Sequence, residues 1–114
     1  MLIDTRTRLE HILQAARKAV SYTEGHTRAE LDTDEPLAVT IIHFCALAGE
    51  AAKKVERNFQ NAHPEVPWKE LADLRNKLFH EYYAVDLDIV WHAAVIDLPG
   101  VIDSLENLLA GEII

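Results

Sequence analysis

The sequence contains little cysteine, glycine and proline, and each shortage excludes a class of structure. The one cysteine among 114 residues, Cys45, leaves no intramolecular disulfide and no metal cage built on thiolates. A free thiol of this kind fits a reducing compartment. Four glycines and four prolines are too few for a turn-rich β-sandwich. These shortages point away from disulfide scaffolds, thiolate metal sites and packed sheets of short strands.

Long apolar segments are missing as well. The first eleven residues carry charges from Asp4 onward and lack the apolar centre of a signal peptide. The longest uncharged run, from Pro36 to Gly49, is too short to span a membrane and contains His43. We therefore expect a soluble, cytoplasmic protein with no membrane partner, in which residues 1–114 form a single domain.

Positive charge is absent from the last third of the chain. Residues 78–114 contain seven acids and no Lys or Arg, whereas residues 53–77 contain six bases and four acids. The net charge of −8 argues against non-specific nucleic-acid binding over the whole surface. Any contact with a polyanion is therefore expected within residues 53–77, although a solvated helix face explains the charge alone more simply.

Helical periodicity is what the sequence does contain. The apolar spacing predicts helices over residues of about 8–24, 36–59, 67–83 and 86–110. Thr7, with Glu10 three residues later, predicts a capping box for the first helix, and Asp86 is a suitable N-cap for the last. Four helices with short connections predict an all-α, up-and-down four-helix bundle.

Single glycines and prolines predict where these helices end, touch or bend. Gly25 is expected to end the first helix, and the polar residues 26–35 have room for one helical turn. Gly49 lies inside the second helix, where glycine costs roughly 1 kcal/mol against alanine, so a close helix contact is expected there. Pro99 followed by Gly100 should kink the last helix or divide it in two.

The segment Leu74–Tyr83 carries the residues with catalytic chemistry. His80 can take or give a proton near neutral pH. Arg75 presents a planar fork that can bind a phosphate and stabilise its developing charge. Asn76 can hydrogen-bond the phosphate or orient His80. The sequence shows no acidic cluster of the kind that binds two metal ions, so we expect metal-independent chemistry without a cofactor.

Helix geometry places a constraint on this set of residues. On one straight helix Arg75 and His80 would lie about 140° apart, whereas Asn76 and His80 would share a face. A single straight helix therefore does not bring Arg75 to His80. Either the helix bends or ends near His80, or the site forms where two copies of the chain meet.

Each of these residues also has a simpler interpretation. Arg75 alone could be a surface ion-pair partner of Glu50 or Asp73, and His80 could cap a helix C-terminus. Tyr82 could be a core residue with its hydroxyl at the rim. Glu50 is either a surface residue or holds Arg75 in place. Cys45 lies in an apolar helix, where packing is a better explanation than nucleophilic chemistry.

Five segments, taken in order, resemble the HepT-like HEPN family. Arg75, His80 and Tyr82 match its R-x-x-x-x-H-x-Y motif, and Asn76 follows the arginine as it often does there. The other matching segments are residues 48–54, 63–68, 85–91 and 97–99. Residues 46–110 resemble the family closely, and residues 8–25 fit its first helix by pattern alone. Ala48 and Thr40 depart from it, and Thr40 leaves one positive charge fewer for an RNA path.

The resemblance implies a specific function. HEPN domains pair as homodimers, with both motifs lining one cleft, and the family cleaves RNA without metal, possible substrates including tRNA. The resemblance further implies a type VII toxin–antitoxin system, in which a nucleotidyltransferase antitoxin attaches AMP to the motif tyrosine, here Tyr82. Arg75, Asn76 and His80 would then be catalytic, with Glu50 in support.

A second function remains open on the sequence alone. The domain could instead be the non-catalytic helical partner of a minimal nucleotidyltransferase, holding a nucleotide or substrate. Arg75 would then bind phosphate without cleavage, and the acidic surface modestly favours this alternative. A purely structural bundle would not need the polar set Arg75, Asn76 and His80. RNA cleavage distinguishes the first two possibilities.

Overall fold

The first helix begins earlier than its apolar stripe predicts. The computed structural model describes residues 4–81 and 84–111, and in it α1 spans Thr5–Ser21. The predicted capping box of Thr7 and Glu10 is wrong, because Asp4 is the N-cap and its carboxylate accepts a 2.7 Å hydrogen bond from the Thr7 backbone N–H. This hydrogen bond holds the pKa of Asp4 below its usual value. Gly25, with φ of 77°, turns the chain after the helix.

The second helix, α2, is shorter than predicted. It spans Glu35–Lys53, begins at the N-cap Asp34, and follows the 3₁₀ turn η1, Arg28–Asp32, which matches the helical turn expected in the connection. The expected continuation to residue 59 is wrong, since a separate helix, α3, spans Arg57–Ala62. The side-chain amide of Gln60 donates 2.9 Å to the Val55 carbonyl at this break. That bond satisfies a carbonyl that a continuing helix would have paired with its own backbone.

The predicted helix over residues 67–83 is divided into two short helices and a strand. They are α4, Trp68–Ala72, and α5, Leu74–Leu78, after which β1, Phe79–Glu81, pairs antiparallel with β2, Ala84–Val85. The prediction that the helix continues beyond Leu78 is therefore wrong for Phe79–Glu81. Phe79 has φ −109° and ψ 117°, which is extended backbone. The aromatic residues that follow Leu78 favour a strand over a helix.

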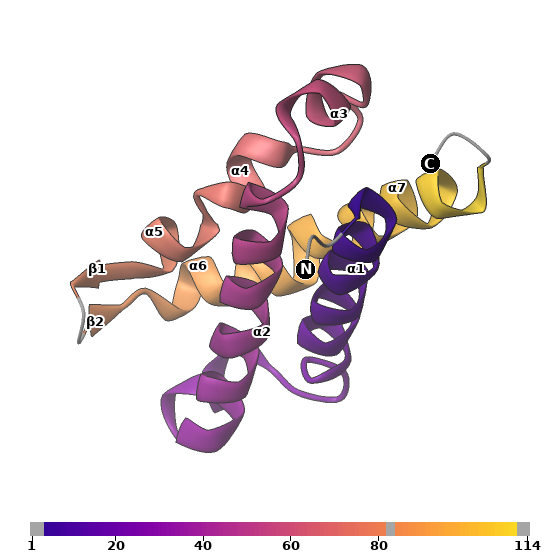
Figure 1. Cartoon of the computed structure of the whole chain (residues 1–114). Coiled ribbons are helices and arrows are strands. Elements are labelled where there is room, and N and C mark those ends of the chain that lie inside the picture. The colour runs from indigo at the N-terminus through magenta and orange to yellow at the C-terminus, as the bar shows by residue number, and fades with distance from the viewer. Residues whose placement is uncertain (1–3, 82–83, 112–114) are drawn as a thin grey trace.

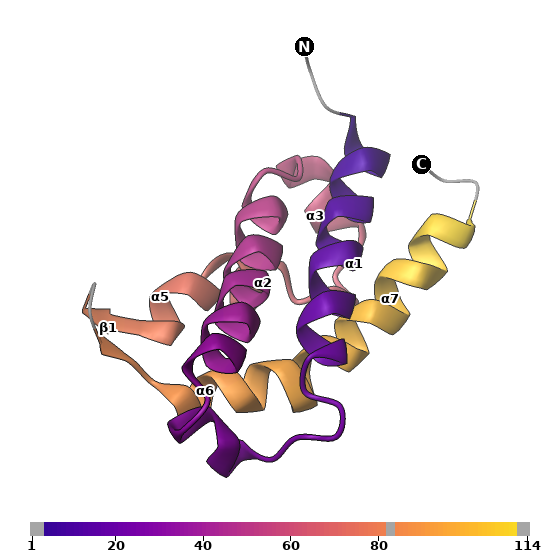
Figure 2. The ribbon, with the colours of Figure 1, turned by 90° about the horizontal axis from the view of Figure 1, so that it is seen from below.

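The last helical segment bends where Pro99 predicts a kink. It consists of α6, Leu87–His92, the π-helical turn η2, Ala93–Asp97, and α7, Leu98–Ala110. Proline has no N–H, and its ring clashes with the carbonyl four residues earlier in a regular helix. The wider π turn ends at Asp97, two residues before Pro99, and takes up this misfit. Figure 2 shows α6 and α7 running in different directions on either side of the turn.

The helices form an all-α bundle with a small hairpin at one edge. Figures 1 and 2 show α2 between α1 and the α4–α5 segment, and α7 packs against α1. The β1–β2 hairpin extends from the bundle beyond α5 (Figure 1). The large side chains that are fully buried come from most of these elements: Leu9, Ile12, Ile41, Leu78, Leu98, Leu105, Val66, Val90 and Cys45.

Helix α2 is the central core helix, and it is long and apolar. Among the described residues it is the one helix whose length and hydropathy would suit a membrane span. Ile41, Cys45 and Ala48 on α2 have no exposed surface, because α1, α4 and α5 pack around this helix. The apolar character of α2 is thus explained by its place inside the bundle.

Gly49 marks the closest approach between α2 and its neighbours. A Cβ at this position would lie 2.5 Å from the carbonyl oxygen of Leu71 and 3.5 Å from the Leu74 Cβ. The close helix contact expected at Gly49 is therefore confirmed. Because the obstacle is backbone, a side chain could be fitted only by moving α4 away from α2.

Gly49→Ala is expected to lower the free energy of unfolding by about 2 kcal/mol, since overpacking outweighs the gain of about 1 kcal/mol in helix propensity. Gly100→Ala is the matched control, because Gly100 lies in α7 and a Cβ there would meet nothing within 4 Å. The control should gain about 0.5–1 kcal/mol. Urea unfolding followed by circular dichroism measures both, and equal effects of the two changes would contradict the close contact.

Candidate active site

The motif residues divide between a helix end and a hairpin. Arg75 and Asn76 lie on α5 and are exposed. His80 lies in β1, where its backbone is described but its side chain is not. Tyr82 and Tyr83 lie outside the described residues. Of the two arrangements expected from helix geometry, the structure supports a helix that ends before His80, and it contains one copy of the chain.

A β-bulge places His80 in a distinctive backbone position. Phe79 pairs with Val85 and Glu81 pairs with Ala84, so β1 advances by two residues where β2 advances by one. His80 is the extra residue between these pairs. The backbone N–H of Asp86 donates 2.9 Å to the Leu78 carbonyl and closes the base of the hairpin. Bulges of this kind reorient a side chain and are frequent beside active sites.

The Arg75 guanidinium lies beside the residue that precedes His80. Its central carbon is 5.7 Å from the centroid of the Phe79 ring, which is within the range of a cation–π contact. Within residues 4–81 and 84–111, no ion pair joins Arg75 to Glu50 or Asp73. The guanidinium is therefore held towards β1 without being neutralised by a carboxylate. Sequence reasoning missed Phe79, although its place one residue before the histidine was the available signal.

Glu50 lies on α2, on the exposed surface. Its carboxylate is 3.8 Å from the Lys53 ammonium, one turn further along the helix. It also lines a groove between α1 and α2. A role in supporting Arg75 stays a prediction, because the ion pair that the structure shows for Glu50 is with Lys53.

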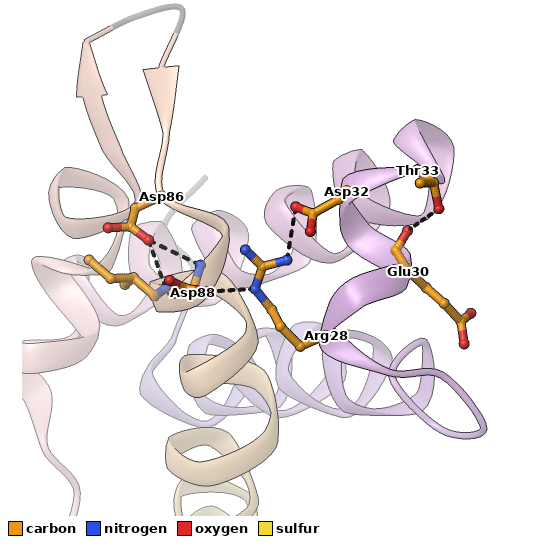
Figure 3. A network of polar contacts seen from close by, with 7 residues as sticks. Arg28, Glu30, Asp32, Thr33, Asp86 and Asp88 are labelled. Carbon is orange, nitrogen blue, oxygen red and sulfur yellow. Dashed lines mark hydrogen bonds and ion pairs between the residues drawn. The ribbon is translucent and has the colours of Figure 1, made fainter.

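A polar network fixes the chain where it leaves the hairpin. Asp86 caps α6, its carboxylate accepting hydrogen bonds of 3.0 Å from the Asp88 N–H and 3.2 Å from the Ile89 N–H. Arg28 of η1 then joins α6 through a 2.7 Å contact with the Asp88 carboxylate, and it also contacts Asp32 (Figure 3). The bond to Asp88 raises the pKa of Arg28. The predicted cap at Asp86 is confirmed, whereas the link through Arg28 was not predicted.

Other candidates for chemistry do not form a second centre. Cys45 is buried, and burial raises the pKa of its thiol to about 12, so it is a packing residue and not a nucleophile. Among residues 4–81 and 84–111, no group of three His, Cys, Asp or Glu side chains is placed to hold a metal ion.

Comparison with known proteins assigns the family. The family described as "Ribonuclease HepT-like" matches residues 12–108. A protein of Caldanaerobacter subterraneus named "Putative RNase" is 32% identical over 107 residues, which cover 94% of this chain and 96% of that protein. A "Probable ribonuclease HepT" of Thermococcus cleftensis is 31% identical over 100 residues, covering 88% of this chain and 91% of its own length. No solved structure gives a significant match. The chain belongs to the HepT-like ribonuclease family.

Proposed function

We propose that this protein is a metal-independent endoribonuclease with Arg75, Asn76 and His80 in its active site. The observation that carries the proposal is the position of the Arg75 guanidinium. It is exposed, and within the described chain it forms no ion pair with Glu50 or Asp73. It lies 5.7 Å from the ring of Phe79, the residue directly before the bulged His80. Arg75, the proposed phosphate-binding group, thus lies beside the strand that carries His80, the proposed proton-transfer group. The ribonuclease names of the relatives support the same reaction class.

The proposed reaction is an internal transesterification. The ribose 2′-oxygen attacks the adjacent phosphorus as its proton is removed, and the bond to the 5′-oxygen of the next nucleotide breaks. The products are a 2′,3′-cyclic phosphate and a free 5′-hydroxyl, which receives a proton. His80 serves in proton transfer, and Arg75 stabilises the charge on the non-bridging oxygens. Asn76 binds the phosphate or orients His80.

His80→Ala is expected to abolish cleavage of total tRNA, whereas the unsubstituted protein cleaves it in excess EDTA. General acid–base catalysis typically contributes about 10²–10⁴-fold, so loss of the imidazole should leave no visible product. Arg75→Lys keeps the charge but loses the planar fork, and it should retain only a small fraction of the rate. Gel analysis with chemical identification of the cyclic ends measures both.

If the protein cleaves no RNA, the ribonuclease proposal is wrong and the second function is favoured. In that function the domain binds a nucleotide or substrate for a nucleotidyltransferase. The protein must first be confirmed as folded, dimeric and unmodified at Tyr82. Cleavage by the unsubstituted protein that EDTA removes would contradict the metal-independent mechanism.

We also propose that two copies of the chain form the working unit. An exposed Arg75 on α5 and a hairpin at the edge of the bundle leave the site open on one side, so a second motif can complete a shared cleft. Light scattering at micromolar concentration should give twice the 12.9 kDa mass of one chain. A monomer of that mass would argue strongly against the composite site.

Regulation is proposed to act through Tyr82. In a cytoplasmic type VII toxin–antitoxin pair, the antitoxin would transfer AMP from ATP to the Tyr82 phenol oxygen and release pyrophosphate. The added phosphate and adenosine would lie two residues from His80. They would exclude RNA by volume and by like-charge repulsion.

Tyr82→Phe is expected to remain an active ribonuclease that the nucleotidyltransferase can no longer silence. Tyr83→Phe is the matched control, because it removes the same hydroxyl from the neighbouring residue and should still be silenced. Mass spectrometry of each variant, coexpressed with a nucleotidyltransferase of the antitoxin class, checks for one added AMP. Modification of Tyr82→Phe but not of Tyr83→Phe would reassign the target to Tyr83.

A further inference from the structure

A groove between α1 and α2 is lined by neither Arg75 nor Asn76, and it contains more cations than carboxylates. It has a volume of about 440 Å³. Its lining residues come from the outer sides of both helices, with Arg8, His11 and Lys18 on α1 and Phe44, Leu47 and Lys54 at α2 prominent among them. Nothing in the proposed active site uses these side chains. The lining includes one carboxylate, that of Glu50, which is paired with Lys53. The groove therefore needs an explanation of its own.

The cations of this groove are not neutralised. Arg8, Lys18 and Lys54 line it and make no ion pair within the described chain. Two other cations on α1 are paired, Arg17 with Glu106 at 2.6 Å and Arg6 with Glu10 at 3.3 Å. In a chain of net charge −8, a groove with three unpaired cations forms a local site for a polyanion.

Aromatic and apolar surface lies beside these cations. The Lys18 ammonium is 5.3 Å from the centroid of the Phe44 ring, and the Tyr22 ring lies nearly parallel to Phe44 with centroids 6.0 Å apart. Tyr22 and Leu47 each keep 45% of their surface exposed. Cations next to accessible rings bind single-stranded nucleic acid, because phosphates contact the cations and unpaired bases stack on the rings.

A second groove in the fold has the opposite character. It has a volume of about 680 Å³ and lies along α4, α5, α6, η2 and α7. Acidic side chains of Glu70, Asp88 and Asp97 line it together with Lys77. Neither Arg75 nor Asn76 lines it. Because Lys77 is the one Lys or Arg among its lining residues, a polyanion is disfavoured in this second groove.

We propose that the α1–α2 groove binds a single-stranded segment of the RNA substrate, next to the segment that is cleaved. This proposal rests on the ribonuclease function proposed above. Helix α2 packs against α1 on one side and against α4 and α5 on the other (Figures 1 and 2). A strand that leaves the motif on α5 needs to cross only one helix, about 10–12 Å wide, to reach the groove.

The test is the affinity of the full-length His80→Ala protein for an unstructured, end-labelled oligouridylate, measured by fluorescence anisotropy. His80→Ala prevents cleavage during the measurement. Lys18→Glu in this background is expected to weaken binding about tenfold and to reduce the salt dependence of binding, because one phosphate contact is lost. Phe44→Leu should weaken binding roughly fivefold or more by removing a stacking surface. It should leave the affinity for duplex RNA unchanged.

Lys69→Glu is the matched control. Lys69 is an exposed lysine on α4 without an ion pair in the described chain, it lies outside the groove, and its substitution makes the same change in charge. It also belongs to residues 53–77, where charge distribution alone places the polyanion contact. If Lys69→Glu weakens binding as much as Lys18→Glu does, the groove proposal is wrong, and RNA is attracted by positive charge anywhere on the surface.

The remaining outcomes also decide between the proposals. If RNA binds but Lys18→Glu has no effect, the groove proposal fails and the ribonuclease function stands. If the folded parent protein binds no RNA, both fail. If Lys18→Glu or Phe44→Leu converts a dimer to a monomer by light scattering, the groove is an interface between copies of the chain and not an RNA site. Lys18 is exposed, so its charge reversal keeps the test decisive even if Phe44→Leu does not fold.

Discussion

Helix α2 approaches α4 so closely at Gly49 that no side chain fits between their backbones, and the position of the motif depends on this contact. The Leu71 carbonyl occupies the space where a Cβ would be. Because α4 leads directly into α5, the contact also fixes Leu74 against α2 and leaves Arg75 on the exposed side of the short helix. The core of the bundle thus determines where Arg75 reaches the surface. A domain of this size has few other ways to hold a five-residue helix in place.

Most of the fold can be predicted from local patterns, and the exceptions share a cause. The helices, the cap at Asp86, the contact at Gly49 and the bend before Pro99 all follow from residues within a few positions of each other. The errors occur where a local pattern competes with another partner. The residues around Thr7 predict that Thr7 caps α1, but Asp4 is the N-cap and accepts the hydrogen bond of the Thr7 backbone N–H. The helix predicted beyond Leu78 is not formed by Phe79–Glu81, because these residues pair with β2 instead.

For the candidate site, the sequence predicts the residues, and the structure shows which elements carry Arg75, Asn76 and His80. Spacing and chemistry single out Arg75, Asn76 and His80, yet helical geometry does not explain how they cooperate. The helix end at Leu78 and the bulge at His80 resolve part of that difficulty, and neither can be inferred from spacing. The contact of Arg75 with Phe79 was missed as well, although the place of Phe79 beside His80 in the sequence was an available signal. The roles of Tyr82 and of a second copy rest on the family resemblance.

The smallness of the hairpin has a thermodynamic consequence. Strands of three and two residues form too few ladder hydrogen bonds to be stable alone, so β1 and β2 depend on the packing of Phe79 and Val85 against the bundle. Local stability is therefore lowest where the histidine is held. A molecule that binds only the formed hairpin adds its binding free energy to that local stability. Binding of such a molecule and ordering of the β1–β2 backbone are then two sides of one equilibrium, so removal of the molecule would also loosen the hairpin.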